Sequence, residues 1–400
     1  MALSPSARVL IIADDLTGAL DTAGPFAQRG LATKVVAQPL HCEADSVRGA
    51  QIVAVNSASR HLPADAAAER VKQCARIFSD QAFDFVFKKI DSTLRGNVAA
   101  ESMALLETSG RQTALIAPAF PQQGRTLKHG VVHVEGVPLA QTGFARDALS
   151  PPPLSPLTEV FAAVSSPERV SSWCHGEDLP SVDGGVVIAD TESEGEMAEL
   201  FAKAAPHAGQ TLLVGSAGLG GELASHLSAG TSRATFDAFS GPIVFVVGSR
   251  ATRSREQVEQ LRKQNATVVL EAPNGIAERA ADTGDAYQIV LLAVEDTSGP
   301  GADAVDVARR LGATGLEIAD RVGANAMVVT GGDTAIALLE VSGCSVIDVC
   351  GNLMPGIPFS SFERNGRRVY LVTKAGGFGA ADTMVDVVRC LRTGAVISEA

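Results

Sequence analysis

Two adjacent carboxylates, Asp14 and Asp15, directly follow the apolar run of residues 9–13. The run predicts a buried strand, and the helical spacing of apolar residues after it predicts an amphipathic helix. The pair would then lie at the carboxyl end of a strand, the edge at which open α/β sheets bind ligands. Because adjacent carboxylates repel, a cation or a hydroxyl-rich ligand would stabilise them. We favour a functional role for the pair; the alternative is one helix cap and one solvated side chain.

A second polar group follows the strand predicted over residues 83–89. Its members carry charges or hydroxyls: Lys89, Asp91, Ser92, Thr93 and Arg95. Arginine binds carboxylates bidentately, and Asp, Ser and Thr can hydrogen-bond the hydroxyls of a sugar. Lys88 and Lys89 alternate across the strand, so at most one is expected to point to the site. The competing interpretation is a capped helix start with Arg95 in a surface salt bridge.

The second half of the chain repeats one local design, in which a strand ends in glycines and a helix follows. The turns are Gly248-Ser249, Gly331-Gly332-Asp333-Thr334 and Gly376-Gly377-Phe378-Gly379. Glycine lets backbone N–H groups approach an anion, and a helix N-terminus adds partial positive charge. Three such turns in one half predict a nucleotide site, in which they would cradle the phosphates or line the base and ribose. None matches a Walker A or protein-kinase loop, and a similar turn at residues 215–218 is a lesser candidate.

Two charged residues beside these turns have alternative interpretations. Asp333 would hold Mg²⁺ or orient a hydroxyl, as phosphoryl transfer requires, or would only cap a helix that begins at Thr334. Lys374 would bind phosphate as a point charge, or would extend from a strand end to solvent.

Composition limits the classes of partner. The 400 residues are 46% hydrophobic, which provides for two or three domains with real cores. The net charge of -12 argues against a nucleic-acid partner, although local basic groups can still bind an anionic small molecule. The six cysteines form no CxxC pair, which argues against zinc and for reduced thiols in the cytoplasm. The sequence has no signal-peptide pattern and no membrane-length apolar run.

Alternating strand and helix patterns predict an α/β fold with two domains, each a mostly parallel sheet flanked by helices. A small hairpin is expected over residues 131–139, and the proline-rich residues 150–156 are expected to form a loop of the first domain. A long helix is predicted over residues 304–322, with Gly312 or Gly315 as the point at which it could break. The polar run of residues 228–240 marks the boundary, which gives domains 1–232 and 233–400.

Taken together, these blocks resemble the four-carbon acid sugar kinase family. The matching stretches follow the family's order and span nearly the whole chain: residues 13–19 with Asp21, 89–96, 118–125 with 130–134, 248–249, 331–334 and 374–379. The resemblance implies a substrate-binding first domain, an ATP-binding second domain and an active site in the cleft between them. It also implies ATP-dependent phosphorylation of the terminal hydroxyl of threonate, erythronate or 3-oxo-tetronate.

The resemblance also assigns site residues. It implies that ATP is held by Ser249, Gly331, Gly332, Asp333, Thr334, Gly376 and Gly377, to which we add Lys374. The acid-sugar site would be lined by Asp14, Asp15, Asp91, Ser92, Thr93 and Arg95, to which we add Lys89. One departure is Arg250, because a second serine and a proline are expected shortly after Ser249.

For catalysis we expect Mg²⁺ and a carboxylate that accepts or orients the hydroxyl proton, namely Asp14 or Asp15, with Asp333 as the rival. The metal ligands are not identified from the sequence. Two other functions were weighed: a cytoplasmic acid-sugar-binding protein without kinase activity, and a nucleotide-dependent oxidoreductase. The first turn lacks GxGxxG, which argues against the oxidoreductase. A homodimer is compatible with an enzyme of this size.

Overall fold

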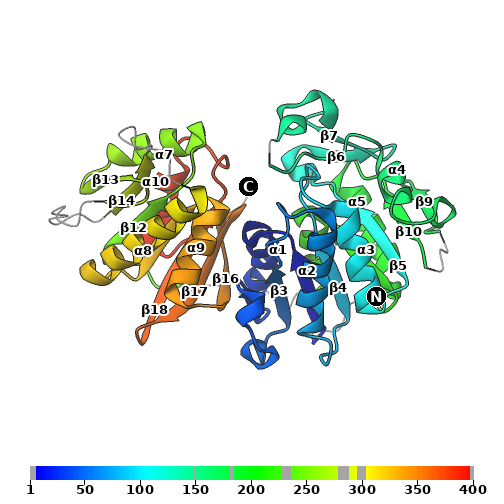
Figure 1. Cartoon of the computed structure of the whole chain (residues 1–400), viewed down its shortest axis with the longest axis horizontal. Coiled ribbons are helices and arrows are strands. Elements are labelled where there is room, and N and C mark those ends of the chain that lie inside the picture. Colours follow the sequence, from blue (N-terminus) through cyan, green and yellow to red (C-terminus); the bar gives the residue numbers. More distant parts are fainter. Residues whose placement is uncertain are drawn as a thin grey trace. The chain divides into compact units, whose positions relative to one another are not determined.

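The computed structural model describes residues 6–147, 149–180, 184–227, 236–277, 288–294 and 303–396. It divides the chain into two compact units, Met1–Ser232 and Arg233–Ala400 (Figure 1). The boundary predicted from the sequence falls within residues 228–235, which lie outside the described residues. Each unit contains a sheet flanked by helices, so the predicted two-domain α/β class is confirmed.

Unit 1 is built on a parallel sheet with the strand order β2-β3-β1-β4-β11-β5-β10-β9. The strands are β1 (Val9–Ala13), β2 (Thr33–Val36), β3 (Ile52–Asn56), β4 (Phe85–Lys89), β5 (Thr113–Ala117), β9 (Val170–Trp173), β10 (Val186–Ala189) and β11 (Thr211–Gly215). Most are continuous apolar runs that are buried along their length, as expected for a parallel sheet covered on both faces. The parallel order brings the carboxyl ends of β1, β3 and β4 to one edge.

The helices of unit 1 pack in pairs, α1 against α6 and α2 against α3. Their bounds are α1 (Leu16–Gln28), α2 (Ala64–Arg76), α3 (Val98–Ser109), α4 (Leu157–Ala162), α5 (Glu194–Ala204) and α6 (Ala217–His226). Pro63 is the N-cap of α2, and this helix ends at Arg76.

A small antiparallel sheet interrupts the α/β pattern of unit 1. It consists of β6 (Arg125–Lys128), β7 (Val131–Val134) and β8 (Val137–Pro138), in that order. The predicted hairpin is therefore present as β7 and β8, and β6 adds a strand that the sequence pattern did not indicate. Residues 150–156 follow as an irregular connection, as predicted.

Unit 2 has a mixed sheet with the order β13-β14-β12-β15-β18-β17-β16. The strands are β12 (Ile243–Val247), β13 (Thr267–Pro273), β14 (Gln288–Val294), β15 (Ala326–Thr330), β16 (Val346–Met354), β17 (Ile357–Arg364) and β18 (Arg367–Lys374). The last three pair antiparallel, and β16 and β17 were not predicted. A signal for β17 exists in Asn365-Gly366, which joins β17 to β18 and whose φ angles of 51° and 72° suit a tight hairpin turn.

The helices of unit 2 are α7 (Thr252–Arg262), α8 (Ala304–Val322), α9 (Gly332–Ser342) and α10 (Thr383–Thr393). The predicted break in α8 is wrong, because the helix is continuous through both of its internal glycines. A Cβ on Gly312 would lie 3.0 Å from the backbone of Leu338 in α9, and one on Gly315 would lie 2.6 Å from Val246. These glycines therefore allow close packing and do not interrupt the helix.

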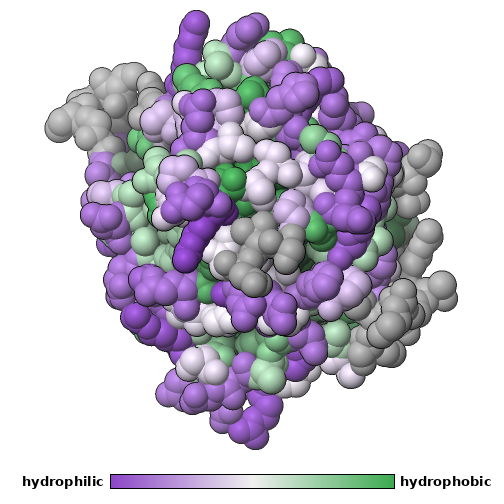
Figure 2. All heavy atoms as spheres, turned by 90° about the vertical axis from the view of Figure 1, so that its right-hand side faces the viewer, coloured by the Kyte–Doolittle hydropathy of each residue, from purple (hydrophilic) through white to green (hydrophobic). Residues whose placement is uncertain are grey.

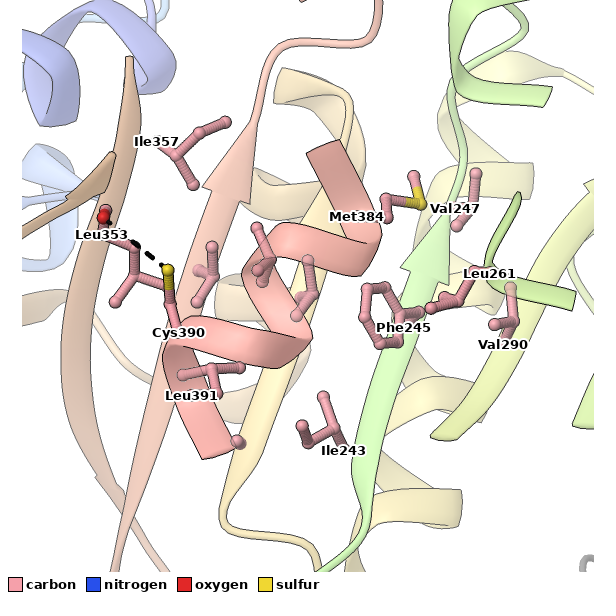
Figure 3. Close-up of a cluster of buried hydrophobic side chains, with 14 of the residues drawn as sticks. Ile243, Phe245, Val247, Leu261, Val290, Leu353, Ile357, Met384, Cys390 and Leu391 are labelled. Atoms are coloured by element: carbon pink, nitrogen blue, oxygen red, sulfur yellow. Dashed lines mark hydrogen bonds between the residues drawn. The ribbon is translucent and has the colours of Figure 1, made fainter. Parts of the chain in front are cut away.

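The core of unit 2 lies between α10 and the sheet (Figure 3). Met384, Cys390 and Leu391 of α10 pack with side chains such as Phe245 of β12, and all four are almost fully buried. On the face drawn in Figure 2, polar side chains predominate and apolar ones appear between them. Within the described parts of the chain, no helix has the length and apolar character to cross a bilayer.

Candidate functional site

The carboxylates after β1 lie where the sequence places them, at the carboxyl end of the strand and the start of α1. Asp15 is the N-cap of α1, and its side chain accepts a hydrogen bond from Gly18 N at 2.7 Å. Asp14 is buried, with 4% of its surface exposed. Capping therefore describes Asp15 correctly, but the second carboxylate is buried and not solvated.

Arg60 joins the two carboxylates. It lies in the irregular segment between β3 and α2, and its side chain is only 10% exposed. Its Nε and Nη2 donate to the two oxygens of Asp14 at 2.7 and 3.0 Å, and its Nη1 donates to Asp15 at 2.6 Å. The cation expected to stabilise this pair is thus part of the chain itself. Sequence analysis missed Arg60, although its position just after a parallel strand was a usable signal.

The charges in this group hold one another in their ionised forms. Burial opposes ionisation of Asp14, but the charges of Arg60 and Lys88 outweigh it and hold the pKa of Asp14 below its usual value. Burial likewise opposes the charge of Arg60, yet the surrounding carboxylates keep the pKa of Arg60 well above its usual value. Asp14 therefore acts as an ionised hydrogen-bond acceptor near neutral pH.

Lys88 and Lys89 reach different helices, as their alternation along β4 predicts. Lys88 Nζ lies 2.9 Å from Glu101 of α3, and both side chains are almost completely buried. Lys89 is 5% exposed and reaches α1, where a Cβ on Gly18 would lie 3.2 Å from its Nζ. Lys89 Nζ donates to the carbonyl of Ile90 and forms no ion pair with any residue that the structure describes.

Asp91 and Arg95 form a bidentate pair directly after β4. Arg95 Nε and Nη2 donate to Asp91 Oδ2 and Oδ1 at 2.9 and 3.0 Å, and Thr93 donates to the same carboxylate through its amide and its hydroxyl. Burial opposes the ionised form of Asp91, but the bonds and charge of Arg95 hold its pKa far below the usual range. Arg95 is therefore already bound by Asp91 and is not available as a free guanidinium. The ion pair is partly buried, so it is not the surface salt bridge of the competing interpretation either. The Ser92 hydroxyl has no partner among the described residues.

The lesser candidate at residues 215–218 serves packing. Ser216 is buried, its Oγ donates to Ala119 O at 2.8 Å, and it accepts from Gly218 N at 3.1 Å. A Cβ on Gly218 would lie 2.5 Å from Ala119 O. The glycine here permits the start of α6 to approach the segment after β5, which leaves the turn without a ligand-binding feature.

In unit 2 the three glycine-rich turns meet at one edge of the sheet. They follow β12, β15 and β18, which are neighbours in the strand order. Gly248 N donates to Thr330 O at 3.3 Å, and Gly331 N donates to Lys374 O at 3.1 Å. A Cβ on Gly248 would overlap the hydroxyl of Thr334, and one on Gly376 would overlap the hydroxyl of Ser249. The absence of side chains at these glycines is thus a steric requirement.

Asp333 does not cap α9. The helix begins at Gly332, and its N-cap is Gly331, which has a φ of 96°. Asp333 lies exposed in the first turn, while Thr334 is buried against Gly248. The N-terminus of α9 therefore presents backbone N–H groups with an exposed carboxylate beside them, and the capping interpretation of Asp333 is wrong.

Lys374 does not extend to solvent, because it is 2% exposed. Its Nζ donates to the carbonyls of Ala375, Gly376 and Phe378 at 2.8 to 3.1 Å. The ammonium group thus lies under the third turn, bonded to the backbone of that turn.

Models of two protein domains match this chain. The "Sugar-binding N-terminal domain" covers residues 9–223, and the "Nucleotide-binding C-terminal domain" covers residues 244–384. A D-threonate kinase from Bordetella bronchiseptica is 31% identical over 96% of this chain and 97% of its own length. A 3-oxo-tetronate kinase from Pseudomonas savastanoi pv. phaseolicola is 28% identical over 96% of this chain and 98% of its own length. The chain belongs to the four-carbon acid sugar kinase family.

The family membership inferred from the sequence motifs is thereby confirmed. Solved structures show the same fold: a Haemophilus influenzae protein superposes with a TM-score of 0.73 at 19% identity, covering 96% of this chain and all of that one. A Salmonella typhimurium protein superposes with a TM-score of 0.77 at 19% identity, covering 97% and 100%. The carboxylate and lysine group lies within the sugar-binding match, and the three glycine-rich turns lie within the nucleotide-binding match.

The turn after Ser249, where the sequence departs from the family pattern, is stabilised by a hydrogen bond within the turn itself. Ala251 N donates to Ser249 Oγ at 3.2 Å, and α7 then begins at Thr252. The hydroxyl of Ser249 thus shapes its own turn. Among the described residues of this kinase-family chain, no cluster of three or more His, Cys, Asp or Glu side chains could hold a metal ion.

Proposed function

We propose that this protein is an ATP-dependent kinase that phosphorylates the terminal hydroxyl of a four-carbon acid sugar. The observation that carries the proposal is the 31% identity to a D-threonate kinase over nearly the full length of both chains. A second D-threonate kinase, from Cupriavidus necator, is also 31% identical, over 93% of this chain. D-threonate is therefore the acid to test first.

The nucleotide would be bound by the turns at the edge of the unit 2 sheet. We assign this role to Ser249, Gly331, Gly332, Asp333, Thr334, Gly376 and Gly377. The steric exclusion of side chains at Gly248 and Gly376 and the N-terminus of α9 fit a phosphate cradle. ATP would enter as its Mg²⁺ complex, in which the cation neutralises charge on the phosphates, and Asp333 is the exposed carboxylate beside the cradle.

The acid sugar would be bound in unit 1. We assign its carboxylate to Lys89, because Arg60 and Arg95 are already bound by aspartates and Lys88 by Glu101. Lys89 is buried and forms no ion pair with the described residues, and only the more distant charges of Asp14 and Asp21 act on it, so its ammonium favours an anion beside it. The hydroxyls of the substrate would be bound by Asp14, Asp15, Asp91, Ser92 and Thr93, with Arg95 holding Asp91 in place.

In the chemical step, the chain would position the terminal hydroxyl and accept its proton. Asp14 and Asp15 are the candidates for this role in unit 1, and Asp333 is the candidate in unit 2. The low pKa of Asp14 makes it a weak base, which suits a loose phosphoryl-transfer transition state in which the hydroxyl loses its proton late. Arg60 would act as a positioning residue, since it fixes both carboxylates.

The proposal is tested by ADP release from the purified protein with ATP and Mg²⁺. The panel contains D- and L-threonate, D- and L-erythronate and 3-oxo-tetronates, with glycerol and threitol as matched polyols that lack the carboxylate. Turnover of one tetronate and of neither polyol supports the proposal. Absence of turnover on every acid, with no thermal shift on adding ATP, contradicts it and would favour a binding protein without kinase activity.

A further inference from the structure

The loop of residues 375–380 directly follows β18. Several of its carbonyl groups accept hydrogen bonds from buried side chains of unit 2. Lys374 Nζ donates to Ala375 O at 2.8 Å, to Gly376 O at 3.1 Å and to Phe378 O at 3.0 Å. An ammonium group has three N–H bonds, so these carbonyls use all of them. The charge of Lys374 is thus directed to the backbone of its own loop.

Helix α7 supplies neutral donors to the same loop. Ser254 Oγ donates to Gly376 O at 2.7 Å, and Gln257 Nε2 donates to Phe378 O at 3.0 Å and to Ala380 O at 2.7 Å. Ser254 and Gln257 have no exposed surface. Two different kinds of side chain, one charged and one neutral, therefore hold the loop carbonyls in the same inward direction.

The direction of the carbonyls determines the direction of the amides. In a planar trans peptide, the C=O of one residue and the N–H of the next point to opposite sides. With the carbonyls of Ala375 and Gly376 turned inward, the N–H groups of Gly376 and Gly377 point outward. Neither amide has an acceptor among the described residues, and a Cβ on Gly377 would meet nothing within 4 Å. The loop therefore presents two amides without a protein acceptor; the space beside Gly377 is open, and Gly376 lies against Ser249 of the first turn.

We propose that Lys374 is a positioning residue of the nucleotide site. Its ammonium holds the loop carbonyls inward and thereby aims the amides of Gly376 and Gly377 at the phosphates, and it does not bind phosphate itself. The inference rests on the proposed nucleotide-binding role of unit 2. It differs from the usual role of a lysine beside a glycine-rich loop, which is a direct phosphate contact.

The same geometry makes the loop sensitive to alkaline pH. Burial lowers the pKa of Lys374 to about 8, and the charge of Arg253 on α7 adds to this effect. The other ionisable groups near the N-termini of the helices that flank the loop are Arg250, Arg255 and Glu256 at α7, Asp333 in the first turn of α9, and Asp382 and Asp386 at the start of α10. A neutral amine donates two hydrogen bonds and cannot serve three carbonyls. ATP affinity should therefore fall as the pH rises through about 8.

The test compares Lys374→Met, Lys374→Arg, Ser254→Ala and Gln257→Leu with the wild type. One measurement is hydrogen–deuterium exchange of residues 375–380 without nucleotide, and the other is the dissociation constant of ATP by calorimetry from neutral to alkaline pH. We expect faster exchange and about tenfold weaker ATP binding in Lys374→Met, the effect of a lost charge-assisted hydrogen bond. Ser254→Ala and Gln257→Leu should change both quantities in the same direction by a smaller factor.

Two controls separate positioning from phosphate contact. Lys374→Arg keeps the charge but cannot place its planar donors on three converging carbonyls, so we expect it to bind ATP as weakly as Lys374→Met. Arg253→Gln removes a neighbouring charge without touching the loop, so exchange should stay unchanged. The alkaline loss of affinity should be present in the wild type and absent in Lys374→Met.

The outcomes that overturn the role of Lys374 differ from those that overturn the proposed kinase function. Unchanged exchange in Lys374→Met overturns the anchoring role. Full ATP affinity in Lys374→Arg, together with unaffected Ser254→Ala and Gln257→Leu, assigns Lys374 to the phosphate instead. A wild-type chain that binds no ATP overturns the proposed function and the phosphate part of the inference, and the exchange comparison then decides the anchoring alone.

Discussion

The two units build their polar sites from different materials. In unit 1 the site consists of charged side chains that pair across long stretches of sequence, as Arg60 does with Asp14 and Asp15. In unit 2 it consists of backbone groups, and the important positions are glycines at which a Cβ would overlap a neighbour. Unit 1 should therefore be sensitive to the loss of a charge, and unit 2 to the gain of a methyl group.

The largest effect is expected for Arg60→Met. This change leaves two carboxylates without their cation, and removal of one partner from a buried ion pair typically destabilises a protein by roughly 3–5 kcal/mol. Urea unfolding of the variant and the wild type measures the loss. Arg48→Met is the matched control, because Arg48 and its partner Asp45 are exposed and the pair contributes little. Equal stability of Arg60→Met and the wild type would show that the carboxylates need no internal cation.

The complementary change in unit 2 is Gly248→Ala. Its methyl group would overlap the Thr334 hydroxyl, so we expect a loss of about 1–3 kcal/mol from overpacking and weaker ATP binding. Thr334→Ala removes the overlapping atom, so the double variant should regain part of the lost stability in thermal unfolding. Gly221→Ala is the control, since that helical glycine has open space around it and alanine should stabilise α6 slightly. Strictly additive effects of the two unit 2 changes would rule out the steric account.

A smaller effect is expected from acid. The pKa of Asp91 is lowered in the folded chain, so its contribution to stability is full above its unfolded pKa of about 3.9 and is lost as the pH falls below that value. Asp91→Asn should therefore be less stable than the wild type near neutral pH, and the difference should shrink on acidification. Urea unfolding across the acid range measures this, with the exposed Asp45→Asn as a control. If the difference in stability between the variant and the wild type is the same at every pH, the ionised form of Asp91 does not contribute to the stability of its pair with Arg95.

The contrast also explains what the sequence could predict. Asp14, Asp15 and the glycine-rich turns follow strands directly, so local patterns placed them at the correct edge of each sheet. Arg60 was missed because its partners lie 46 and 45 positions away in sequence and only the parallel pairing of β1 and β3 brings them together. The partner of Arg95, in contrast, was open to prediction from the sequence. Asp91 lies four residues before Arg95, within reach of a local ion pair.

Errors in the fold have similar causes. The antiparallel strands β16 and β17 do not follow the strand-then-helix order on which the prediction was based, and the Asn365-Gly366 turn that indicates the β17–β18 hairpin was not used. The interior glycines of α8 looked like breaks because their value lies in contacts with α9 and β12, which no local pattern contains. The inward orientation of the loop after Lys374 likewise involves α7, which is distant in sequence and supplies further donors to that loop.

The most direct test of the central claim is two-substrate steady-state kinetics on Lys89→Met and on Gly248→Ala. The account predicts that Lys89→Met raises the KM for the tetronate and leaves the dissociation constant of ATP unchanged. It predicts that Gly248→Ala raises the dissociation constant of ATP and leaves the KM for the tetronate unchanged. The same pattern should appear when D-threonate is the varied acid and ADP release is the readout. Loss of ATP affinity in Lys89→Met, or an unchanged KM for the tetronate in that variant, would contradict the assignment of the acid sugar to unit 1 and the nucleotide to unit 2.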